Sequence, residues 1–319
     1  MRTELMRIGI TGGSGFVGSY LLRRVAALGG KIRVLSRRAA GEFPPNVEHV
    51  EADLLRPDKS ALRRFTRDID VLVHCAGEIR RKDLMEALHV TGTSLLVEAA
   101  RGSVAHWVQL SSVGAYGHRD DEVVTEKTAE APSGPYETTK TASDHIVMTA
   151  ALEGAFALSV LRPSAIIGAD MPNQSVRELI RAVRRRSFFF IGPRGATRNY
   201  IHVEDVVQAL ILCAENSPAT PEVFNLSNCC TIEDFVSWTC DAIGSPNSFP
   251  RIPVGMATLA AKCLSVLPGF PLTLARVRAL TGRAVFDISK LKRERAYQHA
   301  KPISEAILEL VRPEPGARA

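Results

Sequence analysis

This sequence lacks the usual signatures of metal sites, disulfide frameworks and membrane spans. Its six cysteines include no Cys-x-x-Cys pair, and its eight histidines form no His-Glu-x-x-His pattern, so we expect reduced thiols and no bound metal. No uninterrupted apolar run reaches the roughly 18 residues of a transmembrane helix. A strand at residues 7–10 leads directly into a glycine-rich loop, so no signal peptide is expected. The sequence therefore indicates a cytoplasmic globular protein.

Aromatic residues are scarce, at 6%, and none interrupts the densest basic run, which contains Arg181, Arg184, Arg185 and Arg186. We interpret this run as a solvated helix face, with a phosphate-facing role as the alternative. The net charge of +6 suits an anionic ligand such as a nucleotide but does not require nucleic acid. We therefore expect no nucleic-acid partner.

The apolar stretch closest to a membrane segment is Val254 to Leu267, which Lys262 interrupts and Pro268-Gly269 ends. We interpret it as an amphipathic helix, with contact to a membrane or to a lipid-linked substrate as the alternative. The expected partner is accordingly a small molecule and not a membrane.

The first half of the chain shows a regular alternation of strand and helix patterns. Strands are expected near residues 7–11, 31–36, 47–51, 71–75, 106–111 and 158–162. Helices are expected near residues 15–28, 60–66, 82–101 and 135–152. This alternation predicts an α/β fold with a doubly wound parallel sheet of the Rossmann type.

The alternation ends near residue 165, which suggests a division of the chain into two parts. We expect a dinucleotide-binding domain in residues 1–165, to which residues 201–228 return through a helix at 203–215 and a strand at 223–227. A smaller C-terminal substrate-binding lobe is expected from residues 166–200 and 229–319, with an irregular, basic stretch at 170–200.

A glycine-rich loop, Thr11-Gly12-Gly13-Ser14-Gly15-Phe16-Val17-Gly18, follows the first expected strand. A strand, a glycine turn and a helix in this order are typical of a dinucleotide-binding unit. Gly12 would permit the tight turn, Gly15 would let the backbone approach a pyrophosphate, and Gly18 would let the helix pack closely. Free N–H groups and the positive dipole at the helix N-terminus favour phosphates. The alternative is a turn that binds no ligand.

Two further motifs carry groups suited to proton transfer. Tyr136 and Lys140 lie about one turn apart on one helix face. A nearby ammonium stabilises a phenolate and lowers its pKa from the ordinary value of about 10. Ser112 follows the strand expected at 106–110, where its hydroxyl could bond a reacting oxygen. Alone, Ser111 or Ser112 would be an ordinary turn serine, but the order of glycine loop, serine and Tyr-x-x-x-Lys predicts a catalytic site.

These motifs resemble the extended short-chain dehydrogenase/reductase family, also called the NAD-dependent epimerase/dehydratase family, over nearly the whole chain. The resemblance implies a catalytic triad of Ser112, Tyr136 and Lys140, with hydride transfer to or from a nicotinamide. It implies a homodimer built through the helices near 82–101 and 135–152. The implied cofactor site contains Gly12, Gly15, Phe16, Val17, Gly18, Asp53, Leu54, Cys75, Ala76, Gly77 and Pro163.

The end of the second expected strand bears on the choice of cofactor. NAD enzymes place an acidic residue there to hold the ribose hydroxyls. This strand instead ends in Ser36, Arg37 and Arg38, which could hold the 2′-phosphate of NADP. We therefore expect NADP rather than NAD, with exposed loop charges of no such role as the alternative.

Arg198 is the best indication of the substrate. In sugar-nucleotide members of the family, an arginine at the matching position binds the diphosphate, to which a guanidinium fork is well suited. An arginine that ties the lobe to the sheet is the alternative. We expect oxidoreduction or epimerisation of a nucleotide-sugar. The second candidate is a reductase of a lipophilic alcohol resembling the 3β-hydroxysteroid dehydrogenases, and the third is a non-catalytic NADP-sensing protein.

Two departures from the family pattern restrict these expectations. The sugar 4,6-dehydratases carry Thr-Asp-Glu where this chain has Ser112-Val113-Gly114, so dehydration is not expected. His89 replaces an asparagine that helps to position the catalytic lysine through water. Because of that replacement, the sequence does not determine how Lys140 is positioned.

Overall fold

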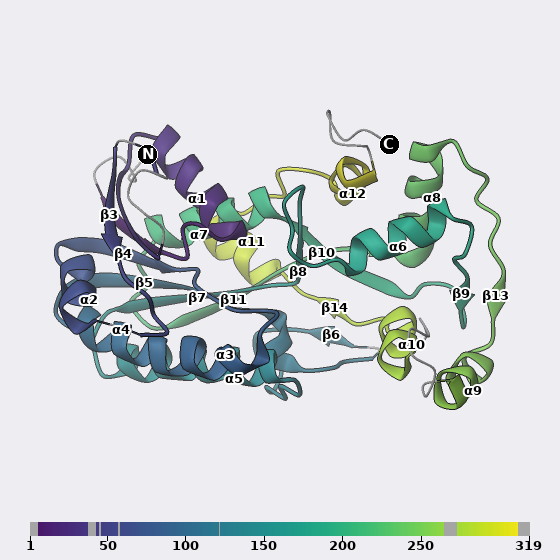
Figure 1. Cartoon of the computed structure of the whole chain (residues 1–319), viewed down its shortest axis with the longest axis horizontal. Helices are drawn as coiled ribbons and strands as arrows, with labels where there is room; N and C mark the ends of the chain where they lie inside the picture. Colours follow the sequence, from purple (N-terminus) through teal and green to yellow (C-terminus); the bar gives the residue numbers. More distant parts are fainter. Residues whose placement is uncertain are drawn as a thin grey trace.

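The computed structural model describes residues 6–37, 43–44, 46–56, 58–120, 122–264 and 273–311. A domain built around one large sheet occupies one end of the molecule, and a smaller lobe occupies the other (Figure 1). Arg38, which was expected at the cofactor, lies outside the described residues.

Seven parallel strands form the central sheet in the order β11-β7-β5-β4-β1-β2-β3. The strand order reverses between β1 and β4, and ligands of such sheets bind at the carboxyl ends of the strands near this point. The prediction of a doubly wound parallel sheet is confirmed. The strands are β1 (Arg7–Thr11), β2 (Lys31–Ser36), β3 (Val47–Glu51), β4 (Ile69–His74), β5 (Val104–Leu110), β7 (Ala157–Pro163) and β11 (Glu222–Leu226).

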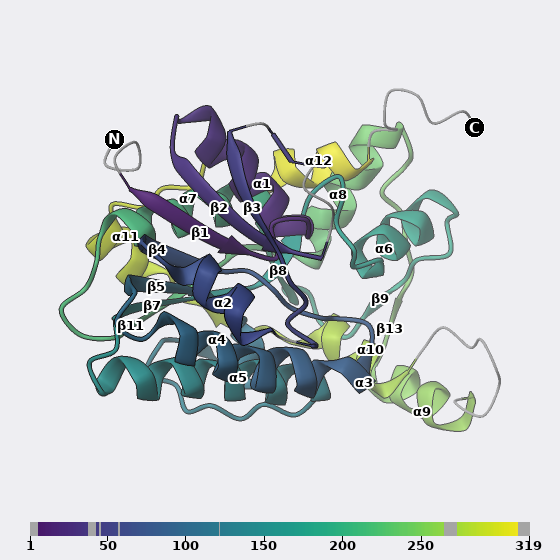
Figure 2. The same cartoon turned by 60° about the vertical axis from the view of Figure 1, so that its left-hand side comes forward.

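Helices cover both faces of this sheet (Figure 2). One face packs against α1 (Phe16–Ala27), α7 (Val203–Glu215) and α11 (Ser289–Arg295). The other packs against α2 (Lys59–Thr66), α4 (Thr93–Ala100) and α5 (Pro135–Leu152). The helix expected at 82–101 consists of α3 (Lys82–Glu86), a π-helical turn at Ala87–Gly92, and α4.

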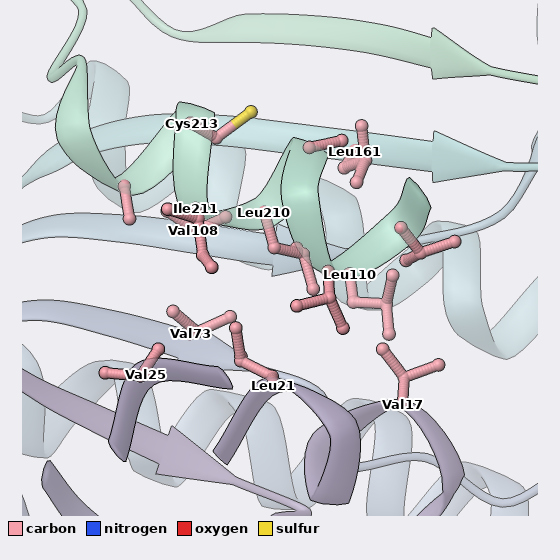
Figure 3. Packing of buried hydrophobic residues seen from close by; sticks show 14 of the residues in the cluster. Val17, Leu21, Val25, Val73, Val108, Leu110, Leu161, Leu210, Ile211 and Cys213 are labelled. Carbon is pink, nitrogen blue, oxygen red and sulfur yellow. The ribbon is translucent and has the colours of Figure 1, made fainter. Parts of the chain in front are cut away.

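The core between α1, α7 and the sheet shows why these segments adopt their structure (Figure 3). Val17, Leu21 and Val25 recur at helical spacing on α1 and are all buried. They point toward the sheet, where β4 contributes Val73 and β5 contributes Val108. Burial of each such side chain stabilises the fold by about 1.5–3 kcal/mol. Because both faces of the sheet are covered, its central strands β4, β5 and β7 are buried over most of their length.

The lobe contains two small sheets and most of the remaining helices. β8 (Ala165–Ile167), β10 (Thr197–His202) and β12 (Asn228–Thr231) form one sheet, and β9 (Phe190–Ile191) pairs with β13 (Arg251–Ile252). Its helices are α6 (Ser175–Arg184), α8 (Ile232–Ile243), α9 (Val254–Leu264), α10 (Leu274–Thr281) and α12 (Ile303–Val311). A short pair, β6 (Val123–Val124) with β14 (Val285–Phe286), joins a loop of the domain to the segment after α10.

The stretch at 170–200 is not irregular as expected, because it contains α6. Val176, Ile180 and Val183 are buried at the i, i+4, i+7 spacing of a helix. The arginines between them occupy the solvent-facing side. Across the described ranges, no helix is both long enough and apolar enough to cross a bilayer.

Candidate functional site

The glycine loop closes tightly between β1 and α1. Gly12 has a φ of +68°, and a Cβ on it would lie 2.7 Å from the backbone nitrogen of Ala76. A Cβ on Gly18 would lie 2.1 Å from the carbonyl oxygen of Gly12. No side chain fits at either position, so both must be glycine. α1 begins after Gly15 with no side-chain cap, which leaves its N-terminus suited to a phosphate.

A cleft of about 980 Å³ lies along the carboxyl ends of the strands and brings the predicted residues together. The glycine loop lines one part of it, and the three predicted catalytic residues line another. The predicted residues on its walls are Gly12, Gly15, Phe16, Val17, Gly18, Cys75, Ala76, Gly77, Ser112, Tyr136, Lys140 and Pro163. Ser36, Arg37, Asp53 and Leu54 line a cavity of about 160 Å³ that shares Gly12, Gly15, Ala76 and Gly77 with the cleft. The arrangement fits a dinucleotide.

The two serines after β5 have different surroundings. Ser112 Oγ accepts a hydrogen bond from the N–H of Gly114 at 3.0 Å, at the start of a 3-10 turn, Val113–Tyr116. The Ser112 side chain also forms a hydrogen bond with Tyr136. Ser111 Oγ instead donates to Oδ2 of the buried Asp144. Ser112 is therefore the serine placed to act together with the phenol.

The surroundings of Tyr136 raise its pKa to about 12, contrary to the expectation that Lys140 would lower it. Burial is the main cause, and the negative charge of Asp144 adds to it, while the hydrogen bond with Ser112 opposes it. The expectation was wrong for this state because burial and the negative charge of Asp144, which lies one helical turn beyond Lys140, raise the pKa of the phenol.

Lys140 and Asp144 are both buried, at 5% and 2% exposure. Burial lowers the pKa of Lys140, and Asp144 partly offsets that effect. Burial raises the pKa of Asp144, against the opposing charges of Lys140 and Arg162. Nη2 of Arg162 lies 3.4 Å from Oδ2 of Asp144. Sequence reasoning missed this carboxylate, although Tyr136, Lys140 and Asp144 follow each other at four-residue intervals on α5.

His89 lies at 2% exposure between the loop that follows β4 and the helix that carries Tyr136. Its Nε2 accepts a hydrogen bond from the N–H of Glu78 at 2.9 Å, so the ring proton is on Nδ1. Nδ1 lies 2.8 Å from Oγ1 of Thr139, and the ring meets the ring of Tyr136 edge-on, with centroids 5.7 Å apart. Burial lowers the pKa of His89 to about 4, so the ring is neutral at pH 7.

A chain of buried polar groups connects the glycine loop with α5. Oγ1 of Thr11 lies 2.7 Å from Nδ1 of His74, and Nε2 of His74 lies 3.2 Å from Oγ1 of Thr93. Oγ1 of Thr93 in turn lies 3.0 Å from Oγ of Ser143. Burial lowers the pKa of His74 well below its ordinary value, so this histidine is also neutral. The chain holds the ends of β1 and β4 in fixed positions relative to α5.

Arg198 lines a different cavity, of about 230 Å³, whose walls include Arg119 and Arg278 and share no residue with the cleft. Its Nη1 donates to the carbonyl of Ala279. Among the described residues, its buried Nε and Nη2 have no hydrogen-bond partner, and burial lowers the pKa of the guanidinium. The guanidinium of Arg198 therefore has two donors that could bind an anion.

Several residues on the walls of the cleft had no motif that could reveal them. Arg80, Asn173 and Gln174 line it from loops. Nη2 of Arg80 donates to the carbonyl of Pro172 at 2.8 Å, which connects the loop after β4 with the lobe. Within the described part of the chain, no three His, Cys, Asp or Glu side chains gather in a way that could hold a metal ion.

A doubly wound sheet with a glycine loop at its switch point and a polar cleft at its carboxyl edge defines a dinucleotide-binding protein of the Rossmann class. Residues 8–227 match the model of the NAD dependent epimerase/dehydratase family, and the chain belongs to this family. The prediction drawn from the motifs is therefore confirmed, and the protein is an enzyme of the short-chain dehydrogenase/reductase type.

The names of similar proteins specify different classes of substrate. The chain is 28% identical to a dTDP-6-deoxy-L-talose 4-dehydrogenase (NAD(P)(+)) of Kitasatospora kifunensis, over 79% of this chain and 83% of that protein. It is also 28% identical to sterol demethylase protein B of Methylococcus capsulatus, over 78% and 80%. The fold matches the crystal structure of UDP-glucuronic acid 4-epimerase from Bacillus cereus in complex with NAD, with a TM-score of 0.73, 18% identity, and 96% and 98% coverage.

Proposed function

We propose that this protein is an NAD(P)-dependent oxidoreductase or epimerase that acts on a nucleotide-sugar. The observation that carries the proposal is the single cleft whose walls include both the glycine loop and Ser112, Tyr136 and Lys140. When bound, the nicotinamide cofactor would supply a hydride in its reduced form and accept one in its oxidised, positively charged form. The side chains orient the substrate oxygen and move its proton.

Tyr136 is proposed as the proton donor in the reducing direction. With a pKa of about 12, the phenol keeps its proton at neutral pH and can donate it to a carbonyl oxygen. Ser112 would orient that oxygen, and the ammonium of Lys140 would stabilise the phenolate that remains. In the oxidising direction, Tyr136 can take a proton only after its pKa falls, which a positive charge beside the phenol would cause.

We propose NADP as the preferred cofactor. Ser36 and Arg37 line the small cavity beyond the glycine loop, and Arg37 is exposed at its edge. A guanidinium there could hold a 2′-phosphate. The solved epimerase from Bacillus cereus is in complex with NAD, so the binding of both NADP and NAD should be measured.

The diphosphate of the substrate is proposed to bind Arg198, because its buried Nε and Nη2 lack partners in the described structure. The similarity to the talose dehydrogenase, whose name specifies a dTDP-sugar, supports this substrate class. The second candidate, a reductase of a lipophilic alcohol, is favoured by the equal identity to sterol demethylase protein B.

We also propose a cytoplasmic homodimer, in which α4 and α5, adjacent on one face of the sheet, form a four-helix interface with the partner.

A thermal-shift panel with NAD, NADP, UDP-sugars and dTDP-sugars tests this function. A ligand at 100 times its Kd stabilises the native state by about 2.7 kcal/mol, which raises the melting temperature measurably. We expect stabilisation by NADP and by one nucleotide-sugar. Arg198→Lys should remove the second effect and retain the first. Stabilisation by a sterol but by no nucleotide-sugar would favour the second candidate.

A further inference from the structure

α9 presents two large apolar side chains, Met256 and Leu259, to the outside of the lobe. Among its described side chains, the buried ones are the small Ala257 and Ala261, at 0% and 1% exposure, which pack in a cluster with Ile191 and Val277. Met256 and Leu259 are 62% and 63% exposed. An amphipathic helix on a globular protein normally has the opposite arrangement, with its larger apolar groups inside.

Five of the exposed positions form one continuous face of the helix, and Val254, at 38% exposure, lies outside it. Gly255, Met256, Leu259, Lys262 and Cys263 are all exposed, and at 3.6 residues per turn they fall within about a third of the circumference. This outer face of α9 contains one basic and no acidic residue. α9 lies at the edge of the molecule, at the end away from the central sheet, in both views (Figure 1, Figure 2).

The chain around α9 is unusually basic. No Asp or Glu occurs in residues 242–286, which contain the five basic residues Arg251, Lys262, Arg276, Arg278 and Arg283. This segment therefore accounts for five of the six units of net positive charge. Arg251 forms an ion pair with Glu233, and Arg276 forms one with Glu178; both glutamates lie outside this segment of the sequence. Lys262 lies on the outer face of α9 itself.

We propose that the outer face of α9 docks on the anionic surface of a lipid bilayer. Met256 and Leu259 would enter the boundary between headgroups and acyl chains, and the net positive charge of residues 242–286 would attract the negative headgroups. A second copy of the chain is a poorer occupant, because contact through this face would bring two acid-free basic segments together. A bilayer requires no concave pocket, which suits the convex surface of a helix. Docking of this kind needs no helix that crosses the membrane.

Co-sedimentation of the full-length protein with vesicles tests the proposal, and it does not depend on the substrate. We expect binding to vesicles of phosphatidylcholine mixed with phosphatidylglycerol, weaker binding to phosphatidylcholine alone, and a decrease as salt is added. Leu259→Glu should weaken binding to the anionic vesicles by about tenfold or more, because one leucine side chain no longer enters an apolar phase.

Val123→Glu is the control, since Val123 is 65% exposed and lies on β6, outside both α9 and the proposed dimer interface. It also replaces an exposed apolar side chain by a carboxylate and should leave vesicle binding unchanged. Both variants replace exposed side chains, so their melting temperatures should match that of the wild type. The proposal is overturned if the wild type does not sediment with anionic vesicles, or if both variants bind equally. Self-association that Leu259→Glu abolishes, without vesicle binding, would instead identify a contact between copies.

Discussion

Nδ1 of His89 lies 2.8 Å from Oγ1 of Thr139, and this contact joins the π-helical turn at Ala87–Gly92 to α5, the helix that carries Tyr136 and Lys140. The other ring nitrogen is occupied by the N–H of Glu78. Because Thr139 Oγ1 donates to the carbonyl of Pro135 at 2.8 Å, it accepts from the imidazole. The ring therefore has no spare N–H for a proton relay, and its role is to hold two segments together.

We predict that His89→Leu destabilises the protein by about 1–3 kcal/mol, because the N–H of Glu78 loses its partner and Thr139 Oγ1 loses one of its two hydrogen bonds. Urea unfolding measures this loss. His89→Asn should recover part of it, since an amide can both donate and accept. An essential proton relay through His89 would give a different result, in which His89→Asn is stable but its turnover collapses.

Tyr136→Phe should reduce turnover by about 10²–10⁴-fold while leaving cofactor affinity nearly unchanged. The phenol oxygen is the group proposed to exchange a proton with the substrate. Steady-state kinetics and cofactor titration separate the two effects. Tyr297→Phe provides the control, because Tyr297 is buried and donates to Asp205 at 2.9 Å. It should cost about 1 kcal/mol of stability and no turnover; normal turnover in Tyr136→Phe would exclude the proposed role.

Arg37→Ser should weaken NADP binding by about tenfold or more and leave NAD binding unchanged, because a charge-assisted contact to the 2′-phosphate is lost. Titration of both nucleotides by fluorescence or calorimetry measures the ratio. Arg24→Ser, at an exposed position on α1, should change neither affinity. If the wild type binds NAD more tightly and Arg37→Ser alters nothing, Arg37 is only a surface charge.

Stability should fall as the pH decreases from about 6.5 toward 4. Burial lowers the pKa of both His89 and His106 from 6.5 to about 4, so they stay neutral in the folded protein where the unfolded chain binds protons. Each then costs up to about 1.4 kcal/mol per pH unit in this range. His106→Gln should reduce the slope of unfolding free energy against pH by about that amount. An unchanged slope in urea titrations would contradict the assignment.

The sequence predicted the elements that local patterns determine. The seven strands of the sheet and the helix of Tyr136 and Lys140 follow from apolar spacing and from the glycine loop. The shift in the pKa of Tyr136 could not be predicted, because its direction depends on burial and on the charge of Asp144. The partners of Asp144 are Ser111, which follows β5, and Arg162, which lies on β7. No local pattern on α5 indicates them. The placement of Arg198 away from the cleft depends on how the lobe packs, which no motif encodes.

The route of the chain determines how this enzyme can be divided. After β7 the chain enters the lobe at β8 and returns to the domain with α7 and β11. It leaves the domain again at β12 and comes back to the sheet with α11. It then re-enters the lobe, where α12 packs against α8. The lobe is thus assembled from three separate stretches of polypeptide. No single cut releases either half intact, so new substrate preferences would have to arise through changes within the existing loops rather than by exchange of a module.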